Sequence, residues 1–319
     1  MRFRNPVLRA YALVAIAAAL ALTGCGARDS RSGSSQNGET AATRTFKTEL
    51  GDLSIKGVPQ RIVALNLQGI DSLVALDLKP VGMALPGGEY PAYLPEVSDV
   101  PSVGSHSSPS VEKVAALKPD LIILDPENQK EQIETMSKIA PVLGIRGRHW
   151  EDTMRELALI GEIVGRKERA DEVASAFRSK LADYQAKAPG DVTVLGLYGA
   201  PDRFFVWTAQ SFIGSLLEEL KADYLYKGSS SDDYSDNAIT SMEKVIAMNP
   251  RVIFLFSGKE KLSDSWKANP LYAKLDAAKN SRVYEMERNL WSRSRGPLAA
   301  GKILDQAAAA LYPTVFPTP

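Results

Sequence analysis

Arginine residues close to aromatic residues are the side chains of this chain best suited to binding a ligand. Trp291, Arg293 and Arg295 lie together, just before Gly296 and Pro297 open the last predicted helix. Guanidinium groups bind paired oxygen atoms, and aromatic faces cover the apolar edge of a ligand. Two arginines at a spacing of two in an extended loop point apart, so we expect one of them to face the ligand and the other to be solvated.

Further candidates lie in segments that follow other predicted strands. Ligands of open α/β folds bind beyond the carboxyl ends of the strands. Trp207 and Tyr198 either face the ligand there or pack in the core, as most tryptophans do. Arg146 and Arg148 either form the opposing wall or remain surface charges. His106 is either a hydrogen-bond donor to the ligand or an exposed loop residue.

The composition disfavours metal chemistry and catalysis. The chain has two histidines, His106 and His149, and one cysteine, which are too few for a zinc finger, an iron–sulfur cluster or a disulfide framework. It contains no G-x-S-x-G, H-E-x-x-H or glycine-rich phosphate loop. We therefore predict no enzyme, no catalytic residue and no protein-bound metal. A secreted hydrolase is the alternative from another class, and a structural adhesin is a third.

The single cysteine, Cys25, follows a segment typical of a signal peptide. Three arginines precede an apolar run, residues 10–22, that is too short to span a bilayer. The residues before Cys25 are small, and the segment resembles the lipobox of bacterial lipoproteins. We expect a signal peptide over residues 1–24 and a lipid on the Cys25 thiol, which would hold the protein at the outer face of the cytoplasmic membrane. The alternative is an ordinary secretory signal with a chance cysteine.

The residues after Cys25 predict a tether and then a folded region. Residues 25–44 are mostly small and polar and predict a flexible tether. Residues 45–50 and 53–57 predict two short strands around a turn at Gly51 and Asp52. Beyond them, short apolar runs alternate with amphipathic helices, including one over residues 70–78, which indicates an α/β chain.

An internal repeat divides the folded region. Residues 110–124 align without a gap to residues 241–255, with eight identities in 15 positions. Each copy reads as a helix followed by a strand, with a proline between them. We expect two similar α/β lobes, over residues 45–149 and 189–319, and chance similarity between two helix–strand units is the alternative.

A long helix is predicted between the two copies. The connecting region covers residues 150–188, and residues 167–187 lack glycine and proline. Their apolar residues recur at spacings of three and four, which predicts a helix about 30 Å long with one apolar face. Its position favours a bridge between the lobes over a surface helix of one lobe. The apolar positions are Ala170, Val173, Ala174, Phe177, Leu181 and Tyr184.

These features together resemble the substrate-binding lipoproteins of bacterial iron–siderophore ABC importers. The resemblance rests on the lipobox, the bridged lobes, the paired S-x-E-K-V modules and the ending NLWSRSRGPLAAGKILDQ. It implies the helical-backbone class of periplasmic binding proteins, with a ferric siderophore or ferric citrate held between the lobes. The chelator, not the protein, would hold the iron. A permease dimer would receive the ligand, and its ATPase would supply the energy for import.

The resemblance also assigns a role to Glu112 and Glu243. They match the family's two docking glutamates, one in each lobe, which meet arginines of the two permease subunits. Each follows a serine by two residues and would lie in the first turn of a capped helix. The alternative role is to complement the helix dipole.

Other partners follow from charge and composition. The chain has 38 basic and 38 acidic residues, and this balance argues against nucleic-acid binding. Removal of the signal peptide leaves three more acidic than basic residues. We expect a monomer. Cobalamin or haem binding by the same fold stays open, whereas a bare zinc or manganese site would need more histidines.

Overall fold

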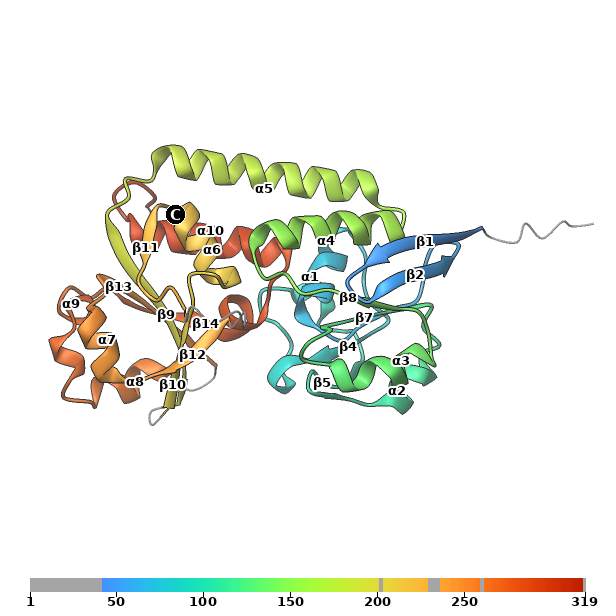
Figure 1. Ribbon diagram of the computed structural model, residues 1–319, viewed down its shortest axis with the longest axis horizontal. Coiled ribbons are helices and arrows are strands. Elements are labelled where there is room, and N and C mark those ends of the chain that lie inside the picture. The colour runs from blue at the N-terminus through green and yellow to red at the C-terminus, as the bar shows by residue number, and fades with distance from the viewer. Residues whose placement is uncertain (1–41, 201–202, 229–235, 259–260, 318–319) are drawn as a thin grey trace, which may run out of the picture. The chain divides into compact units, whose positions relative to one another are not determined.

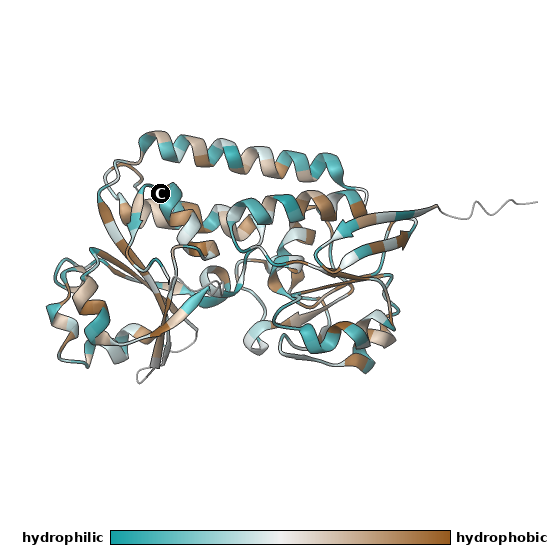
Figure 2. Ribbon diagram, viewed as in Figure 1, coloured by the Kyte–Doolittle hydropathy of each residue, from teal (hydrophilic) through white to brown (hydrophobic). Residues whose placement is uncertain are grey.

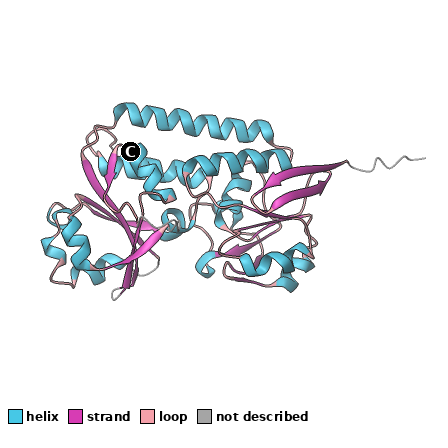
Figure 3. Ribbon diagram, in the orientation of Figure 1, coloured by secondary structure: helices cyan, strands magenta, loops and turns pink. Residues whose placement is uncertain are grey.

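Two β-sheets with helices packed on them form the folded part of the chain (Figures 1 and 3). The computed structural model describes residues 42–200, 203–228, 236–258 and 261–317, all within one compact unit, Ala41–Pro319. The α/β fold expected from the sequence is confirmed. None of the helices in these ranges is long and apolar enough to cross a membrane.

A β-hairpin opens the described region. Strands β1 (Thr43–Thr48) and β2 (Gly51–Lys56) pair antiparallel, so the predicted hairpin is present. Its turn falls one residue pair earlier than predicted, because the Thr48 hydroxyl accepts from the Leu50 amide and donates to the Gly51 carbonyl. Strand β1 includes two residues that the sequence placed in the tether. One of them, Arg44, donates to the Ile163 carbonyl at 2.6 Å.

The first sheet has six strands in the order β6-β5-β4-β3-β7-β8, and only β6 runs antiparallel to its neighbour. The strands in its middle are fully buried, as expected for parallel strands covered on both faces. The strands are β3 (Ile62–Ala64), β4 (Gly82–Leu85), β5 (Ser102–Ser105), β6 (Ser108–Pro109), β7 (Leu121–Leu124) and β8 (Val142–Gly144). Its helices are α1 (Leu67–Ala75), α2 (Val111–Ala116) and α3 (Ile133–Ser137), with short 3-10 turns at Pro86–Gly88, Pro95–Val97 and Lys130–Gln132.

The second sheet is built on β9, which is paired on both sides. Strand β13 lies on one side, while β11 and then β10 pair along the other. The strands are β9 (Val192–Ala200), β10 (Arg203–Trp207), β11 (Ala222–Tyr224), β12 (Asn237–Thr240), β13 (Val252–Ser257) and β14 (Val283–Glu287). The helices are α6 (Phe212–Glu219), α7 (Met242–Met248), α8 (Leu262–Lys267) and α9 (Asp276–Lys279), with a 3-10 turn at Tyr272–Lys274.

The repeated sequence forms equivalent elements in the two sheets. The first copy is α2 followed by β7, and the second is α7 followed by β13. Strand β7 lies between β3 and β8, and β13 lies between β9 and β14, with parallel pairing throughout. The two parallel cores, β4-β3-β7-β8 and β11-β9-β13-β14, therefore have the same topology.

Helix α1 begins three residues before its predicted start. The Asn66 side chain caps the helix by accepting from the Gly69 amide at 2.8 Å, which moves the first turn to Leu67. The helix ends at Ala75, and Asp77 has a positive φ of 58°. Asn66 thus lies between the end of β3 and the start of α1, at the carboxyl edge of the sheet.

Three long helices lie along the two sheets, α4 (Trp150–Ile163), α5 (Lys167–Lys187) and α10 (Pro297–Leu311), and Figure 1 shows α5 running beside the other two. The predicted apolar face of α5 is buried. Ala170 packs in the core of the first sheet, whereas Ala174, Phe177 and Leu181 pack in that of the second. Figure 2 shows hydrophilic and hydrophobic residues alternating along α5.

Candidate functional site

A cavity of about 550 Å³ lies where the loops of both sheets meet. From the first sheet, its lining comes from segments directly after β3, β4, β5, β7 and β8. From the second, it comes from the ends of β9 and β10, the start of β12 and the segment between β14 and α10. The carboxyl ends of parallel strands meet at one edge of a sheet, so the cavity lies where an open α/β fold binds its ligand.

Six of the eight predicted ligand-binding side chains line this cavity. Arg146 and His106 come from the first sheet, and four come from the second, Tyr198, Trp207, Arg293 and Arg295. Trp291 and Arg148 are not part of the lining.

The prediction for Trp291 is wrong, because its side chain lies in the core of the second sheet. The residue is 0% exposed, and its ring centroid is 4.7 Å from that of Phe254 and 5.7 Å from that of Phe256. Its indole nitrogen donates to Gln306 Oε1 at 2.6 Å. Its position beside two arginines suggested that Trp291 would contact the ligand, but its side chain packs in the core.

The prediction for Arg148 is not supported either. Its side chain is 42% exposed, and its Nη2 atom is 3.7 Å from Glu127 Oε2. Arg146 projects into the cavity instead, while Arg148 lies just before α4, where its amide donates to Asp152 Oδ2.

Both Arg293 and Arg295 face the cavity, contrary to the expectation that only one would. Arg293 ends a turn of π-helix, Asn289–Arg293, instead of lying in an extended loop, and Arg295 beyond it donates from Nη2 to Asp236 Oδ2. Arg293 Nη1 donates to Asn289 Oδ1 at 2.9 Å. Opposite it, Gly87 has a φ of 68°, and a Cβ atom there would lie 2.5 Å from Arg293 Nη1. Glycine therefore leaves room for the guanidinium.

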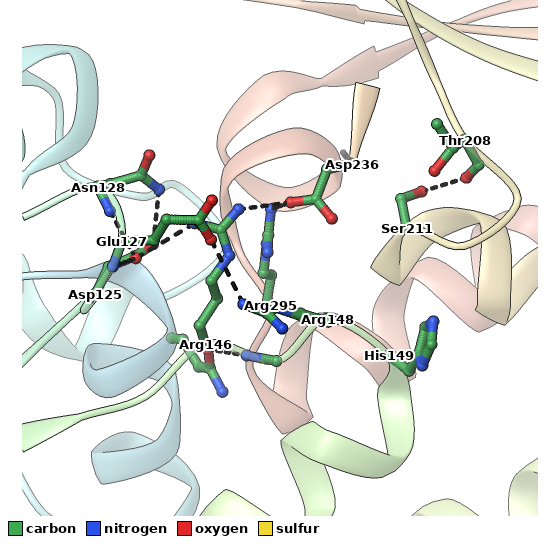
Figure 4. Close-up of polar contacts among 12 residues, drawn as sticks. Asp125, Glu127, Asn128, Arg146, Arg148, His149, Thr208, Ser211, Asp236 and Arg295 are labelled. Atoms are coloured by element: carbon green, nitrogen blue, oxygen red, sulfur yellow. Dashed lines mark hydrogen bonds and ion pairs between the residues drawn. The ribbon is translucent and has the colours of Figure 1, made fainter. Parts of the chain in front are cut away.

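Buried ion pairs hold two of the arginines together. Arg146 Nη2 lies 2.9 Å from Asp236 Oδ2, and Arg295 Nη2 donates to the same oxygen atom (Figure 4). Arg146 Nη1 is also 2.8 Å from Glu127 Oε2 and 3.5 Å from Asp125 Oδ1. Arg146 comes from the first sheet, whereas Asp236 and Arg295 belong to the second. This cluster therefore connects the two halves across the cavity.

Aromatic rings and a further arginine form the wall on the side of the second sheet. The guanidinium carbon of Arg288 is 5.2 Å from the ring centroid of Tyr198, and that of Arg295 is 5.9 Å from the ring of Trp207. The Tyr198 ring also stacks on Phe205 at 5.0 Å. Tyr198 and Trp207, two of the three predicted aromatic residues, thus line the cavity while packing on neighbouring rings.

His106 lies at the opposite wall as a neutral donor or acceptor. Burial lowers its pKa, and the positive charges of Arg293 and Arg295 lower it further, although Asp125 acts in the opposite direction. The imidazole is therefore uncharged at neutral pH.

The described residues contain no group of three or more His, Cys, Asp or Glu side chains that could hold a metal ion. The chemistry of the cavity is that of guanidinium groups and aromatic faces, which recognise oxygen atoms and the flat apolar edges of a ligand.

Comparison with known proteins identifies the fold and its class of activity. A model of the periplasmic binding protein family matches residues 62–290. The chain belongs to this family. Its members and the relatives found are substrate-binding transport proteins, not enzymes, as the sequence predicted.

Curated relatives match over most of their length. The Fe(3+)-citrate-binding protein YfmC of Bacillus subtilis is 30% identical over 93% of this chain and 94% of its own. The Fe(3+) dicitrate-binding periplasmic protein FecB of Escherichia coli is 30% identical over 82% of this chain and 88% of its own. Among solved structures, Staphylococcus aureus SirA complexed with staphyloferrin B has a TM-score of 0.71 and 25% identity, covering 84% of this chain and 98% of that one.

In this periplasmic binding protein, a buried carboxylate fixes the segment that carries Arg293 and Arg295. Asp71 of α1 accepts hydrogen bonds from the amides of Leu298 at 2.8 Å and Ala299 at 2.9 Å, at the N-terminus of α10. A Cβ atom on Gly296 would overlap the Asp71 carboxyl group. Asp71 therefore joins the first sheet to the helix of the second at the point where the arginine segment ends.

Three charged residues of the cavity were not predicted. Asp125 follows β7, so the rule applied to the other strands would have found it. Arg288 lies one residue before the segment that the sequence singled out. Asp236 ends a Ser- and Asp-rich run with no periodic pattern, and nothing in the sequence pairs it with Arg146 or Arg295.

The two predicted docking glutamates of this family member occupy matching positions. Glu112 in α2 and Glu243 in α7 are exposed in the first turn, and serines cap both helices. Hydrogen bonding to its own amide and to Ser241 lowers the pKa of Glu243. Cys25 and the predicted signal peptide lie outside the described residues.

Proposed function

We propose that this chain captures a ferric siderophore or ferric citrate in the cavity between its two sheets and delivers it to an ABC permease. The names of its relatives support the proposal, since two of them bind ferric citrate and a third was crystallised with a siderophore. The protein itself performs no chemical step. Its task is to recognise the chelate and release it to the importer.

The observation that carries the proposal is the charge of the cavity. Four arginines line it, Arg146, Arg288, Arg293 and Arg295, against two aspartates, Asp125 and Asp236. A net positive cavity suits a ferric chelate with carboxylate or other anionic oxygens. Its volume of about 550 Å³ lies in the range of cavities that hold compact organic ligands.

The aromatic residues support the same ligand class. Tyr198 and Trp207 present ring surface beside the guanidinium groups of Arg288 and Arg295. A chelate combines charged oxygens with apolar edges, and this wall offers partners for both. Cobalamin and haem also suit aromatic surfaces, so they serve as comparison ligands.

We further propose that Glu112 and Glu243 dock the loaded protein on the two permease subunits. Both carboxylates are exposed, and each lies at the same position of a repeated helix. Their equivalence suits a partner built from two similar subunits, each offering a positive group. A lipid on Cys25 would keep the protein near that permease.

The proposal is tested by titrating the purified protein, without its signal peptide, with ferric citrate and ferric siderophores of the hydroxamate and catecholate classes. Quenching of tryptophan fluorescence reports binding, because Trp207 lines the cavity. We expect saturable quenching by at least one ferric chelate and none by zinc. Saturable binding of cobalamin or haem without binding of any ferric chelate would contradict the proposal.

A further inference from the structure

Asp236 is a carboxylate buried among the cations of the cavity. Its side chain is 3% exposed, and its Oδ2 atom is shared by Arg146 Nη2, at 2.9 Å, and Arg295 Nη2. The two arginine side chains are themselves only 9% and 13% exposed. The carboxylate therefore lies where an oxygen of an anionic ligand could bind two guanidinium groups at once (Figure 4).

Removing this carboxylate would leave two guanidinium groups facing each other, although Arg146 would keep its ion pairs with Glu127 and Asp125. Guanidinium groups that share one oxygen atom repel each other strongly in a partly buried site, where water screens them little. Asp236 cancels that repulsion in the structure. A ligand oxygen could cancel it too, but only by competing with Asp236.

The other two arginines of the cavity are in a different situation. Within the described part of the chain, no carboxylate lies within ion-pair distance of Arg288 or Arg293. Partial burial lowers the pKa of Arg293, and the positive charge of Arg288 lowers it further, although Glu287 and Glu89 act in the opposite direction. The carboxylates near Arg293 thus act on it at longer range than Asp236 acts on Arg146 and Arg295.

We infer that Asp236 is an internal counter-ion that competes with the ligand for Arg146 and Arg295, and so determines how strongly the cavity prefers highly charged anions. The inference rests on the proposed function. Arg288 and Arg293 bind the anionic oxygens of the chelate first, and Asp236 limits the gain from additional negative charge. The site then retains affinity for chelates of low charge as well.

The test compares Asp236→Asn with the wild-type protein against two ferric chelates, anionic ferric citrate and an uncharged ferric trihydroxamate. Isothermal titration calorimetry at constant pH and ionic strength gives both affinities. In the variant, we expect the affinity for ferric citrate to rise by about tenfold and that for the uncharged chelate to change by less than about threefold. The ratio of the affinity for ferric citrate to that for the uncharged chelate tests the inference.

Glu127→Gln is the matched control. Glu127 pairs with the same guanidinium, at 2.8 Å, but its side chain is 52% exposed, so solvent already screens its charge. We expect this variant to keep the wild-type ratio. Asp236→Glu restores the negative charge and should return the ratio toward the wild-type value. If Asp236 mattered only for packing, restoring the charge would not restore the ratio.

The possible outcomes distinguish the role of Asp236 from the proposed function. Binding of a ferric chelate by the wild type, with an unchanged ratio in Asp236→Asn, would overturn the role of Asp236 and leave the proposed function intact. Absence of binding of any ferric chelate by the wild type would overturn both. If Asp236→Asn does not fold, as judged by circular dichroism, Asp236→Ser offers a smaller neutral acceptor, and the same shift in the ratio is expected.

Discussion

Arg293 is the exposed arginine of the cavity, and its guanidinium is held in place by Asn289 rather than by a carboxylate. It is therefore ready to bind a ligand oxygen. We expect Arg293→Ala to weaken binding of an anionic ferric chelate by about ten- to a hundredfold, the usual loss for a charged hydrogen bond. Fluorescence titration measures this change. Arg148→Ala is the matched control and should change the affinity by less than about threefold, and equal losses in both variants would contradict the assignment of the site.

Asp71 predicts a pH dependence of stability. Burial raises its pKa to about 7, although hydrogen bonds from Leu298, Ala299 and Tyr93 and the charge of Lys302 act in the opposite direction. Because the folded state has the higher pKa, its stabilising effect is complete below about pH 4 and is lost as the pH rises through about 7. Stability should therefore fall between pH 5 and pH 8.

Urea unfolding of the wild type and of Asp71→Asn at those two pH values tests this. Burial also raises the pKa of Glu156 to about 7, so that residue contributes a slope of the same sign. Asp71→Asn should remove part of the slope, and the double variant with Glu156→Gln should remove more. An unchanged slope in both variants would show that neither group titrates as inferred.

At this scale, the sequence predicts which residues lie at the cavity better than it predicts which side chains contact one another. The positions of Arg146 and His106 just after strands, and of Tyr198 and Trp207 near the ends of strands, were enough to place them at the cavity. The burial of Trp291 was not predictable, because it depends on the packing of Phe254 and Phe256 from a distant strand. Contacts between groups far apart in the chain leave no local pattern.

The N-terminus of α10 is the element that positions the arginine segment. Gly296 lies against Asp71, and a Cβ atom there would overlap the carboxyl group. We expect Gly296→Ala to destabilise the protein by about 1–3 kcal/mol, the usual cost of overpacking a buried contact, and to weaken ligand binding as well. Thermal unfolding and titration measure the two effects.

Gly301, in the same helix, provides the control. Nothing lies within 4 Å of a Cβ atom built there. Gly301→Ala should keep ligand affinity and should stabilise the protein by about 1 kcal/mol, because alanine is the better helix former. If both substitutions had the same effect, the close approach of Gly296 to Asp71 would not matter.

Elements with a long periodic pattern could be predicted, and those determined by side-chain caps could not. Helix α5 has the predicted bounds, because its apolar residues recur over 21 positions without glycine or proline. Helix α1 begins earlier than predicted because one side chain, Asn66, decides its first turn. The π-helical turn at Asn289–Arg293 has no signal in hydropathy, and it ends at Arg293, which lines the cavity.

At the scale of the whole molecule, the two halves repeat one topology and present equivalent glutamates. We expect the double charge reversal Glu112→Lys and Glu243→Lys to reduce uptake of ferric chelate by cells by about tenfold or more, while the affinity of the purified protein for the chelate changes by less than about threefold. The lysines would repel the positive groups that we propose on the two permease subunits. Uptake of iron-55 by cells that depend on this protein measures the effect.

Glu134→Lys and Asp264→Lys together form the control. Each is an exposed carboxylate in the first turn of a different helix, one in each half. This pair should leave uptake unchanged. Loss of uptake in both double variants would point to total charge rather than to docking, and loss of chelate affinity in the first would place its glutamates in the ligand site.

The central claim is that the arginine-lined cavity holds one ferric chelate. Equilibrium dialysis of the purified protein against iron-55 citrate, with parallel samples of ferric siderophores, measures it most directly. The account predicts saturation at about one chelate per chain with at least one of these ligands, and strongly reduced retention by the Arg293→Ala variant. Failure of the folded wild-type protein to retain any ferric chelate, while it retains cobalamin or haem, would contradict the account.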